Sequence, residues 1–165
     1  MNIEGNKIDI TIYRKNILLR RKIIMEDRYR KEIYSMFNRY IMTYQVKDEK
    51  DTFNIYIQFN GQYSVTHKRK SIKKGKINPK NLVPWLQLFI DEDYTNDYSG
   101  GSNDPFKRIR FMDTTETLRV ITVTEGLPAP KIVYEFVGLL DMLLSPEFVD
   151  DKFNKDSKLI TKIKK

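Results

Sequence analysis

A run of positive side chains is the most distinct chemical feature of this sequence. Seven lysines and arginines fall within the fourteen residues from His67 to Lys80, and no carboxylate interrupts them. Clustered cations of this kind bind phosphate backbones and release their counterions. We therefore predict a basic arm that contacts nucleic acid or a neighbouring subunit, formed by Lys68, Arg69, Lys70, Lys73, Lys74, Lys76 and Lys80. The alternative is a solubilising loop, because many charge runs are simply solvated.

Two other basic groups extend this interpretation. Arg108 and Arg110 alternate with apolar neighbours, a pattern that predicts a basic face on a sheet. The C-terminal lysines share helical spacing with Leu159 and Ile163, which predicts a basic amphipathic helix. Such a helix can dock on a subunit, a nucleic acid or a membrane surface, although no membrane role is expected; the alternative is a frayed tail. These C-terminal contact residues are Lys158, Lys162, Lys164 and Lys165.

Residues for catalysis are scarce. His67 is the single histidine and the chain has no cysteine, so histidine triads, thiolate zinc sites and cysteine nucleophiles have no partners. Neither a GxGxxG motif nor a P-loop occurs. We expect no enzymatic activity, no cofactor and no small-molecule substrate.

Carboxylates are the remaining candidates for metal binding. Residues 91–104 concentrate them in Asp91, Glu92, Asp93, Asp97 and Asp104. Hard cations prefer such oxygen ligands, although the spacing does not fit an EF-hand. A solvated acidic loop is the other interpretation, and an enzyme with carboxylate-metal chemistry, such as a nuclease, is a third-ranked function.

Composition sets the class of protein. The chain has 165 residues, 40% of them hydrophobic, and a net charge of +8. This length usually forms one domain, and a positive charge favours polyanionic partners. Usage is biased towards Ile, Lys, Asn, Tyr and Phe, with Ala129 as the only alanine. That bias indicates an A/T-rich genome, as in many bacteriophages and mobile elements.

The first half of the chain predicts strands around one long helix. Strands are expected at 7–13 and 17–24, the second being ambiguous with a helix, and a helix at 26–45, where Phe37, Tyr40 and Tyr44 form an apolar stripe. A hairpin is expected at 52–67. We favour a three-residue loop, Asn60–Gln62, which pairs Ile57 with Val65.

The second half repeats this alternation. The pattern predicts a short helix at 82–90, a polar loop at 91–106, a hairpin of 107–112 with 117–124, and a helix at 131–144. Ser145 and Pro146 have the residue types of a helix N-cap and first turn, so another helix is expected there. The fold class is α+β: an antiparallel sheet built from hairpins alternating with helices in the order ββα ββα ββαα.

Together these features predict one α+β domain over 1–154 with a basic tail over 155–165. No signal peptide or membrane span is expected, so the location is cytoplasmic or within a virion. The leading interpretation is a structural subunit of a homo- or hetero-oligomeric assembly, such as the neck, connector or tail region of a bacteriophage. The alternative is a free nucleic-acid-binding or regulatory protein of a phage or mobile element that contacts phosphates.

Overall fold

The computed structural model describes residues 35–94, 97–98, 104–113, 115–124 and 126–158. The chain divides into two compact units, Met1–Asn38 and Arg39–Lys165. Of the first unit, residues 35–38 are described; they are helical, and Phe37 is buried. The strands predicted at 7–13 and 17–24 lie outside the described residues. The organisation into a domain over 1–154 and a tail over 155–165 stays a prediction.

The helix predicted over 26–45 is wrong in its last part. Residues 35–39 are helical, but strand β1, Tyr40–Lys47, follows directly. Tyr40 and Tyr44 fit helical spacing, yet with Met42 between them they fit strand alternation equally well. β1 has a hydrogen-bonded neighbour on each side, β2 and β6, and this pairing overrides the local helical pattern.

The predicted hairpin over 52–67 is present with a different register. Strands β2, Thr52–Gln58, and β3, Gln62–His67, pair Ile57 with Tyr63 rather than with Val65. The loop has three residues, but it runs from Phe59 to Gly61. Gly61 has a φ of 89°, a conformation that favours glycine. The loop therefore places its glycine last, and Phe59 is left exposed.

The predicted basic arm is instead a strand of the sheet. β4, Lys70–Lys76, pairs with β3 along its length. Lys68 and Arg69 form the two-residue turn between the strands with positive φ angles of 52° and 65°, as a hairpin with the usual right-handed twist requires. β4 gave no strand signal because the positions on its helix-facing side are Lys73 and Gly75 rather than apolar residues.

The sheet has the strand order β4-β3-β2-β1-β6-β7-β5. The hairpin of β6, Phe106–Met112, and β7, Leu118–Val123, confirms the prediction for this region. In this order the six strands from β4 to β7 pair antiparallel, and the two-residue β5, Asp97–Tyr98, pairs with β7 in parallel. This supports the α+β class, while the hairpin–helix alternation is reproduced only loosely.

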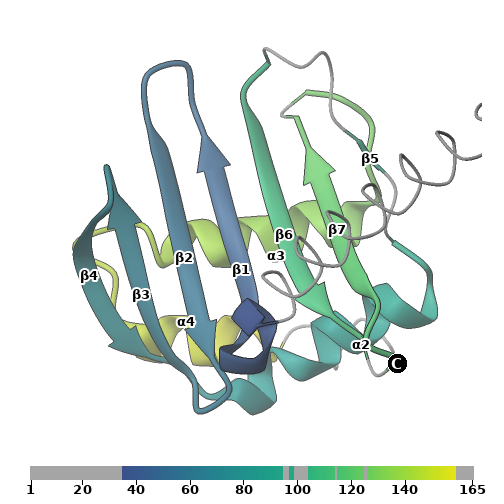
Figure 1. The fold of residues 1–165 in the computed structure, drawn as a ribbon, viewed down its shortest axis with the longest axis horizontal. Helices are drawn as coiled ribbons and strands as arrows, with labels where there is room; N and C mark the ends of the chain where they lie inside the picture. The colour runs from purple at the N-terminus through teal and green to yellow at the C-terminus, as the bar shows by residue number, and fades with distance from the viewer. Residues whose placement is uncertain (1–34, 95–96, 99–103, 114, 125, 159–165) are drawn as a thin grey trace, which may run out of the picture. The chain divides into compact units, whose positions relative to one another are not determined.

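Three α-helices are described beside this sheet. A 3-10 turn, η1 at Pro79–Asn81, leads into α2, Val83–Asp91, with Pro84 in its first turn as predicted. The predicted helix at 131–144 is α3, Lys131–Met142. α4, Asp150–Asp156, follows, and α3 and α4 cross behind the strands in Figure 1.

The helix start predicted at Ser145 is wrong. Residues 145–148 form a turn in which the N–H of Phe148 donates to the carbonyl of Ser145, and α4 begins five residues later at Asp150. The reason lies in the tertiary contacts of this turn, because its carbonyls accept hydrogen bonds from Lys73 on β4.

One hydrophobic core joins the helices to a single face of the sheet. Trp85 of α2 stacks on Phe136 of α3, with ring centroids 5.1 Å apart. The strands contribute side chains at alternate positions, among them Met42, Tyr44 and Ile109, all fully buried. In the part of the chain that the structure describes, no helix is both long and apolar enough to span a bilayer.

Candidate nucleic-acid interface

Side-chain contacts identify which face of the sheet the helices cover. The hydroxyl of Tyr44 on β1 donates to Asp141 of α3 at 2.6 Å, and the hydroxyl of Tyr63 on β3 donates to Asp150 of α4. Lys107 on β6 donates to Asp141 from the same face, at 2.5 Å. Successive side chains on a strand point to opposite faces. Their sequence neighbours therefore point away from the described helices.

The register aligns those neighbours across five strands. Lys74 of β4 is opposite Ser64, and Ser64 is opposite Tyr56. Tyr56 is in turn opposite Thr43, which is opposite Arg110 of β6. This row joins a cation at the sheet edge to a cation near its centre. A parallel row carries Thr66, Asn54, Gln45 and Arg108.

Charge is segregated between the strands and the rest of the fold. The six antiparallel strands contain no Asp or Glu, whereas they contain nine lysines and arginines. These are Lys47, Lys70, Lys73, Lys74, Lys76, Lys107, Arg108, Arg110 and Arg119. A surface built from these strands has a positive potential that no carboxylate of the same strands offsets.

We call the surface of the sheet that faces away from the described helices the basic face. Its charged members are Lys47, Lys74, Lys76, Arg108 and Arg110, and its aromatic members are Tyr56 and Phe106. The three lysines are exposed, and the two arginines and two aromatic rings are partly exposed. The basic face therefore combines cations with flat apolar surfaces.

Aromatic rings on the basic face are close to cations. Arg108 lies with its guanidinium carbon 4.2 Å from the ring centroid of Phe106, and the ammonium of Lys47 lies 5.7 Å from the same centroid. The ring of Tyr56 lies 5.3 Å from that of Tyr40. Cations at these distances are attracted to the ring faces, so Phe106 is part of a mixed cation–aromatic surface, whereas Tyr56 neighbours another aromatic ring.

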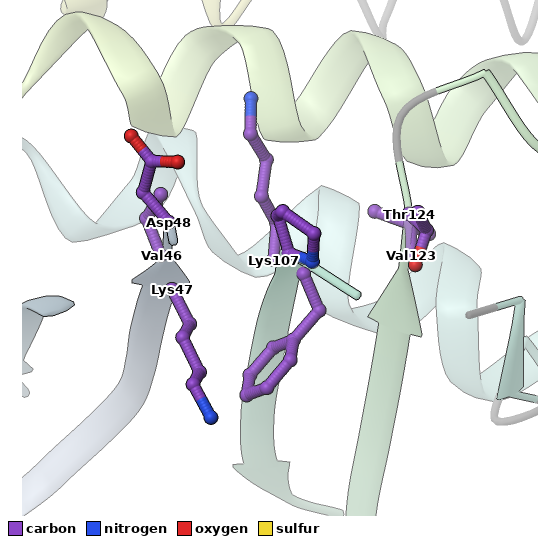
Figure 2. Close-up of a pocket in the computed structure, with 8 residues that line it drawn as sticks. Val46, Lys47, Asp48, Lys107, Val123 and Thr124 are labelled. Carbon is purple, nitrogen blue, oxygen red and sulfur yellow. The ribbon is translucent and has the colours of Figure 1, made fainter. Parts of the chain in front are cut away.

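A groove opens where β1 and β7 end and β6 begins. It has a volume of about 550 Å³, which is within the usual range for ligand pockets. Figure 2 shows that the lysines lining it point in opposite directions, Lys107 towards α3 and Lys47 away from it. Phe106 and Pro105 also line the groove. The groove therefore connects the basic face to the rim of the helical layer.

The buried acid–base contacts are structural in character. Burial, followed by the nearby charge of Asp141, raises the pKa of Tyr44 far above its ordinary value. Burial and the hydrogen bond to Asp150 likewise raise the pKa of Tyr63. Both phenols therefore remain neutral donors at physiological pH. In the described ranges no cluster of three or more metal-ligating side chains occurs.

A second polar cluster fixes the β6–β7 turn. Asp113 accepts hydrogen bonds from Thr115, from the backbone N–H of Thr117, and from Arg119 at 2.9 Å. Arg119 also donates to Asp93, at 2.6 Å, in the turn after α2. Burial alone would raise the pKa of Asp113, but these hydrogen bonds outweigh it and lower the pKa well below its usual range. Asp93, which the sequence offered as a cation ligand, therefore forms an ion pair with Arg119.

The predicted contact residues are distributed over several surfaces. Lys74, Lys76, Arg108 and Arg110 belong to the basic face, whereas Lys73 points to the helices and binds the carbonyls of Ser145 and Phe148. The others lie elsewhere. Lys68 and Arg69 form the β3–β4 turn and Lys70 begins β4, while Lys80 lies in η1 and Lys158 is the second residue after α4. Lys162, Lys164 and Lys165 lie outside the described residues.

Sequence reasoning missed Lys47, Tyr56 and Phe106. Lys47 and Phe106 are 59 positions apart in the chain and become direct neighbours only through the β1–β6 register. Tyr56 was assigned to a strand, and its position between two inward-facing isoleucines could have placed it on the polar face.

Comparison with protein-family models, with curated proteins and with solved structures gave no match. Function is therefore inferred from the residues of this chain.

Proposed function

We propose that this protein binds nucleic acid without catalysing a reaction, and that the basic face contacts the phosphate backbone. The observation that carries the proposal is the segregation of charge: the six antiparallel strands contain no carboxylate, and five of their nine cations lie on the basic face. Backbone contacts by lysine and arginine provide most sequence-independent affinity for nucleic acid.

The dimensions of the basic face suit this partner. Lys74 and Arg110 are separated by four strand intervals, which is roughly 19 Å at about 4.8 Å per interval. Nucleotides of one B-form strand rise about 3.4 Å each, so these two cations span about five to six of them. Partly exposed polar side chains such as Ser64, Asn54 and Gln45 lie in the rows between the cations, and they can donate to phosphate and sugar oxygens.

The test is a salt titration of nucleic-acid binding by fluorescence anisotropy. The double variant Lys74→Ala/Arg110→Ala should weaken binding of any sequence and reduce the salt slope on duplex DNA by about 1.8, at about 0.9 per phosphate contact. The matched control is Lys131→Ala/Lys152→Ala, which removes the same charge from α3 and α4.

The control should keep most of the affinity, because its lysines belong to the helices on the opposite side of the sheet. Equal losses in the two double variants would show that net charge alone attracts the ligand. Absence of binding by the unmodified protein at low salt would contradict the proposal outright.

A second candidate is a subunit of a larger assembly, and the outer edge of β4 favours it. Among the described strands β4 lies at one end of the sheet order, and Ile72 within it has an exposed fraction of 53%. Edge strands with free backbone groups pair with strands of other chains. The lysines of β4 would select a partner subunit that presents an acidic extended segment. The bacteriophage setting rests on residue usage and stays a proposal.

Native mass spectrometry of the complex with a captured subunit distinguishes this candidate. Ile72→Lys should abolish the association while leaving nucleic-acid affinity unchanged or higher. Retention of the complex by this variant would contradict assembly through β4.

A further inference from the structure

Phe106 has the surroundings of a base-stacking site. Its ring is partly exposed at the start of β6 and lines the groove of about 550 Å³. It does not belong to the hydrophobic core that holds the sheet and helices together. Because the ring lies outside the core and is partly exposed, its exposed part can contact a ligand.

The position of the ring is fixed by its neighbours. The guanidinium carbon of Arg108 lies 4.2 Å from the ring centroid. The Nε of Arg108 donates to the Thr122 hydroxyl at 3.0 Å, which holds the guanidinium in place. Lys47 approaches from the neighbouring strand, and its long side chain is exposed. Arg108 thus holds the ring of Phe106 in position, and the flexible side chain of Lys47 lies near the same ring.

The charge of the groove suits a phosphate next to a flat apolar group. Lys47 and Lys107 line the groove together with one carboxylate, Asp48. Asp48 accepts a hydrogen bond from the N–H of Glu49 at 2.6 Å, and Lys107 is paired with Asp141. Lys47 is therefore the cation best placed to reach a phosphate bound beside the Phe106 ring.

We propose that the groove at Phe106 takes an unpaired nucleotide, with the base stacked on the Phe106 ring and its phosphate bound by Lys47, so that the protein prefers single-stranded to duplex nucleic acid. This inference rests on the proposed nucleic-acid binding. In a duplex the bases are stacked on one another and cannot reach the ring, whereas a single strand can turn one base outward. Stacking on an aromatic side chain is tolerant of sequence because every base has a π-face.

The experiment compares a single-stranded oligonucleotide with a duplex of the same sequence, both fluorescently labelled, at one fixed salt concentration. Phe106→Ala should weaken single-strand binding by about tenfold, within the range reported for loss of one stacked base, and should change duplex binding less than about twofold. Phe106→Trp should retain the single-strand preference, and its indole fluorescence should be quenched by the oligonucleotide. The single native tryptophan, Trp85, is buried in the core and provides a constant background.

Phe106→Leu keeps an apolar side chain without a ring and serves if the alanine variant is unstable; it should behave like the alanine variant. Equal weakening of single-strand and duplex binding, or no change in either, would overturn the stacking site while leaving backbone binding intact. Adenosine monophosphate should bind at least a hundredfold more weakly than the oligonucleotide, and equal affinity would overturn the assignment to a strand. If the unmodified protein bound neither the single strand nor the duplex, the stacking site and the proposed nucleic-acid binding would both be overturned.

Discussion

Lys73 of β4 reaches across to Phe148 in the turn between α3 and α4. Its ammonium lies 5.2 Å from the ring centroid, and it donates hydrogen bonds to the carbonyls of Phe148 at 3.2 Å and Ser145 at 2.8 Å. Lys74, the next residue, points to the opposite face. Two adjacent lysines of one strand therefore have different roles.

Lys73→Ala and Lys74→Ala should affect different properties: the first should lower stability, and the second should weaken nucleic-acid binding. Lys73→Ala removes two hydrogen bonds and a cation–π contact from a partly buried side chain, and we expect a loss of about 1 kcal/mol in unfolding free energy. Lys74→Ala should leave stability unchanged, because its side chain is exposed. Urea denaturation and anisotropy measured on both variants test this. If the two variants lost nucleic-acid affinity equally, the assignment of the faces would be wrong.

Asp113 should make stability depend on acid pH. Its folded-state pKa lies below the unfolded value near 4, so its stabilisation is complete above about pH 4 and is lost as pH falls towards the folded pKa. Asp113→Asn should lower the melting temperature at pH 7 and flatten this acid dependence. Glu116→Gln, an exposed residue of the same turn, is the control. An unchanged acid profile in Asp113→Asn would contradict the prediction.

Gly61→Ala should destabilise the fold more than Gly126→Ala. Both glycines have positive φ, at 89° and 86°, which costs an L-residue about 1 to 2 kcal/mol. At Gly61 an added Cβ would also meet the carbonyl oxygen of Ile77 at 1.9 Å, whereas at Gly126 nothing lies within 4 Å. Thermal melting of the two variants measures the difference. Equal melting temperatures would show that the backbone contact at Ile77 is not constraining.

Tyr44→Phe should lower the unfolding free energy by about 1 kcal/mol, the usual net value of a hydrogen bond. The variant removes the donor to Asp141 from a fully buried position without changing the packing of the ring. Tyr56→Phe on the basic face is the control, and its effect should be smaller because the side chain is partly exposed. Denaturant curves of both variants measure the two losses in unfolding free energy, and a larger loss for Tyr56→Phe than for Tyr44→Phe would contradict the prediction.

The sequence by itself determined the elements whose own apolar residues repeat with a clear period. α3 was predicted because Val133, Phe136, Val137 and Leu140 form one helical stripe, and all four are buried. The β6–β7 hairpin was predicted from alternation on both strands and a polar turn. In these elements the position of a residue along the chain is enough to predict whether its side chain faces the core.

The tertiary structure alone decided β1, β4 and the composition of the basic face. Spacing at Tyr40 and Tyr44 fits a helix and a strand, and only pairing with β2 and β6 on both edges selects the strand. β4 has Lys73 and Gly75 on its helix-facing side, so the alternation of apolar and polar residues that predicts a strand is missing. The register that brings Lys47 beside Phe106 joins residues far apart in the chain. Such pairing depends on long-range contacts that no local pattern encodes.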